Sequence, residues 1–144
     1  MSEEVTMDFE PIAVVGVITD EVGTPSNDGT AGSALYAVPL RLSRTVDAEQ
    51  ARMLEQIWDH PPRFTTMHRP GVARVAGNRF VLNETTVDEV ASYHVETLRA
   101  VVQQFNADMA KLSERRAADL ATQEASAAEH RQHVREVVDE IRFN

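Results

Sequence analysis

The stretch that decides the fold is residues 86–112, which read TVDEVASYHVETLRAVVQQFNADMAKL. Its apolar residues recur at steps of three and four, the spacing that places side chains on one face of an α-helix. The members of this face are Val87, Val90, His94, Leu98, Val101, Phe105, Met109 and Leu112. Thr86 and Glu89 match a capping box, so we expect the helix to begin beside Thr86.

The helical pattern continues to the end of the chain, because residues 86–144 contain neither proline nor glycine. The apolar face follows an eleven-residue period, which favours a nearly straight helix or a slightly right-handed supercoil over a heptad coiled coil. A lone helix of this composition is only marginally stable in water. We therefore expect residues 113–144 to fold back as a helical hairpin, to pack on another protein or to pack on another copy, and of these we favour self-association as a dimer. The residues expected in that contact are Leu112, Leu120, Val134, Val138 and Ile141.

The first two β-strands are expected near the N-terminus. Residues 12–19 are apolar on both faces, which predicts a strand that is buried on both sides or central in its sheet. A loop rich in glycine, residues 20–34, separates it from a second strand at 35–43. Pro39 favours an edge position for this second strand, because proline has no N–H to donate.

A short helix and a hairpin are expected next. Residues 46–58 carry an apolar stripe at helical spacing after Thr45, a residue that can cap a helix. Residues 72–76 and 79–83 predict a hairpin around Gly77-Asn78. In that register one face of the hairpin consists of Ala73, Val75, Phe80 and Leu82.

The expected fold is therefore α+β. A small antiparallel sheet of about four strands, with one short helix, is followed by a long C-terminal helix or helical hairpin. The expected organisation is a flexible acidic arm (1–11), an α+β domain that includes the first half of the long helix (12–112), and a helical tail for oligomerisation or docking (113–144).

Composition limits the kinds of chemistry that the chain can perform. It has 144 residues and no cysteine, which excludes disulfides, iron–sulfur clusters and thiolate zinc sites. The net charge of −9 disfavours binding to nucleic acid and to anionic membranes. The N-terminus has no basic segment typical of a signal peptide, and the longest apolar run is too short to span a membrane. We expect a cytoplasmic protein with protein partners.

The unusual segment of the chain is residues 59–71, DHPPRFTTMHRPG. One interpretation is an anion or ligand pocket formed by Arg63, His68 and Arg69, in which Asp59 orients His60 or His68 as a general base. The other interpretation is a rigid, proline-stiffened connector whose charges lie in water. A metal site would require His60 and His68 to converge with His94, which otherwise belongs to the apolar face of the long helix.

These observations lead to two hypotheses about function. No catalytic motif is present at a recognised spacing, and no cofactor is expected. The first hypothesis is a non-enzymatic interaction or regulatory protein that self-associates through its C-terminal helix. The alternative is a small enzyme, or a metal- or anion-binding protein, that uses the loop at 59–71.

Overall fold

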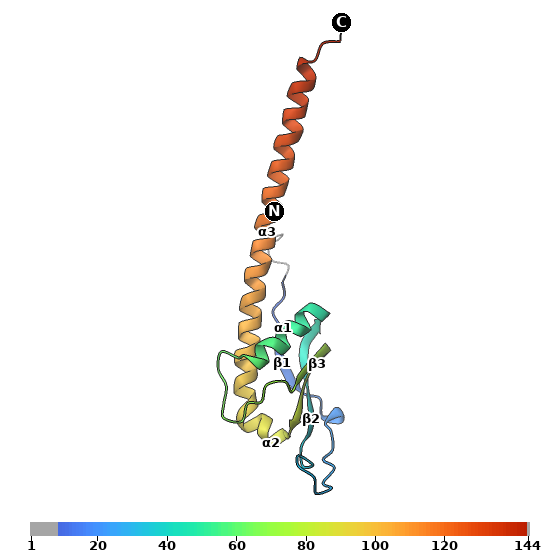
Figure 1. The fold of residues 1–144 in the computed structure, drawn as a ribbon, viewed down its shortest axis with the longest axis vertical. Coiled ribbons are helices and arrows are strands. Elements are labelled where there is room, and N and C mark those ends of the chain that lie inside the picture. Colours follow the sequence, from blue (N-terminus) through green and yellow to red (C-terminus); the bar gives the residue numbers. More distant parts are fainter. Residues whose placement is uncertain (1–8, 144) are drawn as a thin grey trace. The chain divides into compact units, whose positions relative to one another are not determined.

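The structure is a computed structural model that describes residues 9–143 (Figure 1). The described residues divide into two compact units, which are residues 11–108 and residues 109–143 together with 9–10. The elements are β1 (Val14–Val17), a 3-10 turn (Thr19–Glu21), β2 (Tyr36–Val46), α1 (Ala48–Asp59), β3 (Ala73–Thr85), α2 (Val87–Glu89), a π turn (Val90–His94) and α3 (Val95–Glu140). The predicted acidic arm, residues 1–11, lies almost wholly outside the described residues.

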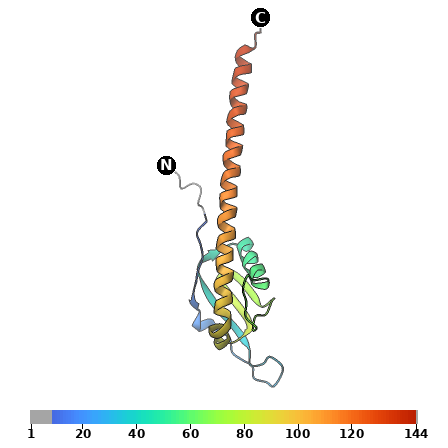
Figure 2. The same ribbon diagram turned by 90° about the vertical axis from the view of Figure 1, so that its left-hand side faces the viewer.

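The unit formed by residues 11–108 has two layers. One layer is an antiparallel sheet in the order β1-β2-β3. The other layer consists of α1 and the first part of α3, which lie against one face of the sheet (Figure 2). The indole of Trp58 in α1 joins the layers, because it contacts the rings of Phe80 in β3 and His94 in the π turn. This confirms the predicted α+β class with one short helix and one long C-terminal helix.

The positions of β1 and β2 in the sheet differ from the prediction. β1 lies at the edge, with Val15 62% and Val17 41% exposed, and β2 is central. Pro39 is tolerated in the central strand because its carbonyl accepts from Ile18 N–H at 2.9 Å, one residue beyond the end of β1. The N–H and C=O of a residue in an antiparallel strand point to the same side. The position where Pro39 lacks an N–H is therefore on the side of β1, and no hydrogen bond to β3 is lost.

The predicted count of about four strands is too high, because residues 73–85 form one uninterrupted element, β3. The chain nevertheless reverses within this element. Asn83 N–H donates to Val72 O at 3.0 Å, whereas an extended strand would place these residues about 36 Å apart. The chain reverses at Gly77, whose φ is +62°. A two-residue turn with glycine in its first position requires such a positive φ. The four residues predicted to share a face are all buried: Ala73, Val75, Phe80 and Leu82.

Helix α1 begins two residues later than predicted. Its N-cap is Asp47, whose side chain accepts from Gln50 N–H at 2.8 Å, so Thr45 remains at the end of β2. The helix ends at Asp59, because His60 precedes a proline and adopts a non-helical conformation. α1 buries Leu54 and Trp58 completely, which sets the position of the segment that follows.

The long helix starts as predicted, because the Thr86 side chain accepts from Glu89 N–H at 3.0 Å. After the π turn, α3 runs without interruption from Val95 to Glu140, so the alternative of a helical hairpin is wrong. The predicted apolar face is buried at Val90, His94, Leu98, Val101, Phe105 and Met109. Val87 is an exception, at 40% exposed.

The unit that follows residue 108 is helical to Glu140, and its side chains become exposed along the helix. Every described residue from 118 to 143 is exposed. Among residues 9–143, no helix is both long enough and apolar enough to cross a lipid bilayer.

Candidate functional site

The segment from His60 to Val72 is held in place by its own neighbours. Asp59 Oδ1 accepts from Gly71 N–H at 2.7 Å, which closes the segment at its base. The indole N–H of Trp58 donates to Arg69 O at 2.8 Å. Both anchors belong to the last turn of α1. The position of the loop therefore follows from the burial of Trp58, and Asp59 serves as a backbone acceptor in this arrangement.

His68 packs against the same indole. Its ring centre lies 4.8 Å from that of Trp58, and its Nε2 lies 2.7 Å from Trp58 O. A carbonyl oxygen only accepts hydrogen bonds, so Nε2 carries the proton and donates. The Nε2 lone pair is consequently unavailable to act as a base or a metal ligand. Phe64 also packs on His68, with ring centres 5.5 Å apart.

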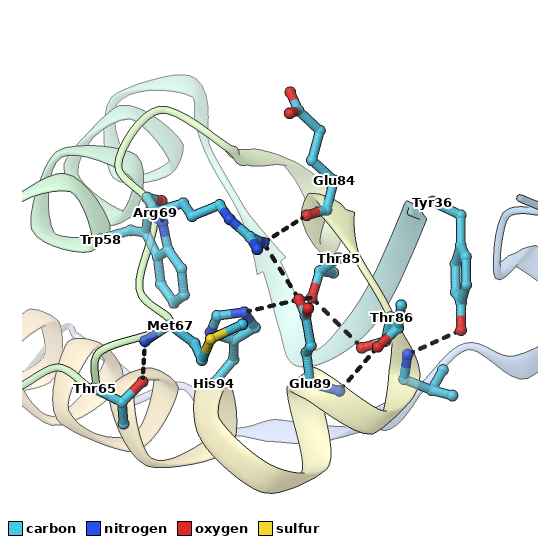
Figure 3. A network of polar contacts seen from close by, with 11 residues as sticks. Tyr36, Trp58, Thr65, Met67, Arg69, Glu84, Thr85, Thr86, Glu89 and His94 are labelled. Atoms are coloured by element: carbon cyan, nitrogen blue, oxygen red, sulfur yellow. Dashed lines mark hydrogen bonds and ion pairs between the residues drawn. The ribbon is translucent and has the colours of Figure 1, made fainter. Parts of the chain in front are cut away.

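Arg69 points away from the loop towards the start of the long helix (Figure 3). Its NH1 donates to Glu84 O at 2.9 Å and to Glu89 Oε1 at 3.3 Å. The Arg69 and Glu89 side chains are 37% and 19% exposed, so the pair is partly shielded from water. Glu89 offsets the positive charge that an anion pocket would require of Arg69.

A bulge in β3 brings Thr85 to the same carboxylate. Glu84 has a φ of +54°. Between the pairs Val38–Leu82 and Tyr36–Thr85, β3 advances by three residues while β2 advances by two. Such a bulge turns the next side chain towards the opposite face. Thr85 is thereby 1% exposed, and its hydroxyl donates to Glu89 Oε1 at 2.8 Å. Glu89 thus connects the loop, the sheet and the helix.

His94 is the buried titratable group of this region. It is 2% exposed, its Nε2 lies 4.0 Å from Glu89 Oε1, and its Nδ1 has no hydrogen-bond partner among the described residues. Burial lowers the pKa of His94, the charges of Arg69 and His68 act in the same direction, and the Glu89 carboxylate opposes them. Burial therefore favours the neutral form of His94, which packs edge-on against Trp58 with ring centres 5.6 Å apart.

The remaining residues of the predicted sites do not converge. His60 and Arg63 are exposed, at the start of the loop, whereas His68 and His94 contact Trp58. Within residues 9–143, no three histidine or carboxylate side chains come close enough together to hold a metal ion. The geometry of the described loop is that of a connector packed around Trp58.

A groove of about 650 Å³ lies between β1 and the long helix. We call it the β1 groove. Two of its lining residues are joined, because the Asn106 side chain exchanges two 2.9 Å hydrogen bonds with the backbone of Ile12. Its lining is predominantly apolar and comprises residues 12–17, Leu40, Val87, Val90, Ala91, Val95, Leu98, Arg99, Val102, Gln103 and Asn106. The groove gives apolar side chains of β1 a surface to line although β1 is an edge strand.

The second unit carries a separate exposed apolar surface. We call it the C-terminal face, and its members are Leu120 (59% exposed), Val134 (43%), Val137 (41%), Val138 (56%), Ile141 (43%) and Phe143 (91%). Four of the five residues predicted for oligomerisation belong to it. The fifth, Leu112, is half-buried.

Sequence reasoning missed two features of these sites. Glu89 was expected only as a capping residue, yet its side chain bonds to Thr85 and Arg69. The β1 groove was missed because the apolar character of residues 12–17 was attributed to burial within the sheet. The chain matches no protein-family model, no curated protein and no solved structure, so its function is inferred from its own residues.

Proposed function

We propose that this protein is a non-enzymatic interaction module that self-associates through the C-terminal part of α3. The observation that carries the proposal is the C-terminal face. Val134 and Val138 lie one helical turn apart near the end of α3, Ile141 directly follows the helix, and all three are exposed. Exposed apolar side chains that recur on one side of a helix end are typical of a protein-binding site.

The energetics of the helix support this proposal. An isolated helix owes little stability to its own hydrogen bonds, and most helices in proteins are stabilised by packing of an apolar face. Fully burying one valine or leucine side chain contributes roughly 1.5–3 kcal/mol. Burial of several members of the C-terminal face in a partner would therefore stabilise residues 118–143 substantially.

The polar loop gives weaker support to the alternative hypothesis of an enzyme or an anion-binding protein. His68 donates to Trp58 O, Arg69 is paired with Glu89, and Asp59 accepts from Gly71. These contacts use the loop side chains to hold the α+β unit together, which favours the interaction module.

The test is the mass of the full-length protein in solution, measured by light scattering over a range of concentrations. We expect a dimer of twice the 16.0 kDa chain mass. Leu120→Asp and Val138→Asp should each produce monomer, because a carboxylate is costly to bury at an apolar contact. A monomer at every concentration for the unaltered protein would refute the proposal.

Two control variants make this test specific. Ala125→Asp introduces the same charge about 140° around the helix from both Leu120 and Val138, and it should leave the dimer intact. Arg69→Ala perturbs the loop and should not change the mass. If Ala125→Asp dissociated the protein as readily as Val138→Asp, added charge alone would explain the effect.

A further inference from the structure

The β1 groove is suited to bind an apolar helix. Val15 and Val17 line it from the strand, Val95 and Val102 line it from α3, and Arg99 adds a positive charge. A helix that enters a groove of this kind needs apolar residues at i, i+4 and i+7. The C-terminal face provides Val134 and Val138 at i and i+4 of α3, and Ile141 at i+7 directly follows the end of the helix.

We propose that two copies pair with their α3 helices antiparallel, so that the C-terminal face of each copy lies in the β1 groove of the other. This inference rests on the self-association proposed above, to which it adds a direction and a register. α3 itself forms one wall of the groove, so the helix end that enters the groove is that of the second copy.

The spacing along α3 defines the register. Val102, Leu120 and Val138 are each 18 residues apart, which is about five complete turns at 3.6 residues per turn. They consequently share one face of the helix. An antiparallel pair centred on Leu120 places Leu120 against its own equivalent in the second copy. Val138 of each copy then lies opposite Val102 of the other, inside the β1 groove.

The charges near the centre favour the antiparallel direction. Arg116 precedes Leu120 by four residues and Glu124 follows it by four. An antiparallel pair centred on Leu120 brings Arg116 of one copy opposite Glu124 of the other, twice per dimer. A parallel pair would place Arg116 opposite Arg116 and Glu124 opposite Glu124, where like charges repel. The exposed acids of the helix end, Asp139 and Glu140, also approach Arg99 in the antiparallel arrangement.

Disulfide cross-linking tests the direction and the register, and the absence of native cysteine makes the result unambiguous. A disulfide forms only when the two Cα atoms lie within about 4.4–6.8 Å. Leu120→Cys should give a covalent dimer under mild oxidation. The matched control Thr122→Cys, about 160° away around the helix, should give far less.

The decisive experiment mixes the Val102→Cys and Val138→Cys chains, which are distinguishable by a mass tag on one of them. We expect the mixed covalent dimer as the main product and little product from either chain alone. In the antiparallel register, position 138 of one copy is separated from position 138 of the other by about 54 Å, at 1.5 Å per residue.

The other outcomes each contradict a defined part of the reasoning. Self-linking of Val138→Cys would show a parallel pair or another antiparallel register, and it would overturn this inference while the proposed self-association stands. A dimeric mass without links at position 120 or between 102 and 138 would also overturn the inference alone. A monomeric unaltered chain would overturn both proposals. Circular dichroism of each variant, compared with that of the unaltered chain, excludes misfolding as the cause of a missing link.

Discussion

Glu89 joins three parts of the α+β unit, and its removal provides a quantitative test of the structure. Its Oε1 accepts from Thr85 Oγ1 at 2.8 Å and from Arg69 NH1 at 3.3 Å. Replacement by alanine leaves the buried Thr85 hydroxyl without its shortest hydrogen bond. The helix cap persists, because Thr86 accepts from the backbone N–H of residue 89, which alanine retains.

The expected magnitude follows from these contacts. A buried polar group left without its partner costs about 1–3 kcal/mol, and a partly exposed ion pair contributes about 0.2–1 kcal/mol. We therefore expect Glu89→Ala to lower the free energy of unfolding by about 1–4 kcal/mol. Glu89→Gln keeps an acceptor for Thr85 and should cost less than Glu89→Ala.

Urea denaturation followed by tryptophan fluorescence measures this loss. Trp58 is the single tryptophan of the chain, and it lies in the affected region. Asp88→Ala is the matched control, because Asp88 is the exposed neighbouring acid. All variants are compared at one protein concentration, since self-association would add a concentration-dependent stability. A loss for Glu89→Ala no larger than that for Asp88→Ala would refute the role assigned to Glu89.

Three further predictions concern the same unit. The pKa of His94 is lowered in the folded state, so its stabilising contribution is fully present above the unfolded value of about 6.5 and is lost as the pH falls towards the folded value. The free energy of unfolding, measured by urea denaturation at pH values on both sides of about 6.5, should change less with pH for His94→Gln than for the unaltered chain. The same pH dependence in both proteins would contradict the buried neutral state. Gly77→Val should cost roughly 1–2 kcal/mol, because a β-branched residue is strained at a φ of +62°; Gly77→Asn should cost less in thermal unfolding, and equal losses would argue against a left-handed conformation. Asp59→Ala should cost about 0.5–1.5 kcal/mol and accelerate hydrogen exchange at the Gly71 amide, whereas unchanged exchange would mean that the 2.7 Å bond does not close the loop.

The periodic parts of the fold could be predicted from the sequence, because the patterns that indicate them involve residues close together in the chain. The steps of three and four from Val90 to Met109 identify the buried face of the long helix. The capping role of Thr86 is local in the same sense, since donor and acceptor are three residues apart. The faces of β3 were also predictable, because the turn at Gly77 fixes which residues on its two sides point the same way.

The candidate sites were readable only in part. The loop at 59–71 was recognised as unusual from its prolines, histidines and arginines, but the use of its side chains depends on distant residues. Arg69 pairs with Glu89, twenty residues away, and the His68 ring packs against the buried indole of Trp58. Such pairings leave no local periodicity, so composition alone could not distinguish a ligand pocket from a packed connector.

Local patterns thus establish the α+β class, the long helix and the alternation of buried and exposed residues. The tertiary structure decides the strand order, the place of Pro39 in a central strand and the meeting of Thr85, Arg69 and His94 around Glu89. The physical reason is that these features depend on contacts between distant segments, whose free energies are set by packing and burial and not by neighbours in the chain. The exposed apolar surface at β1 also depends on the tertiary structure, because residues 12–17 are equally apolar in the sequence whether a sheet or a partner covers them.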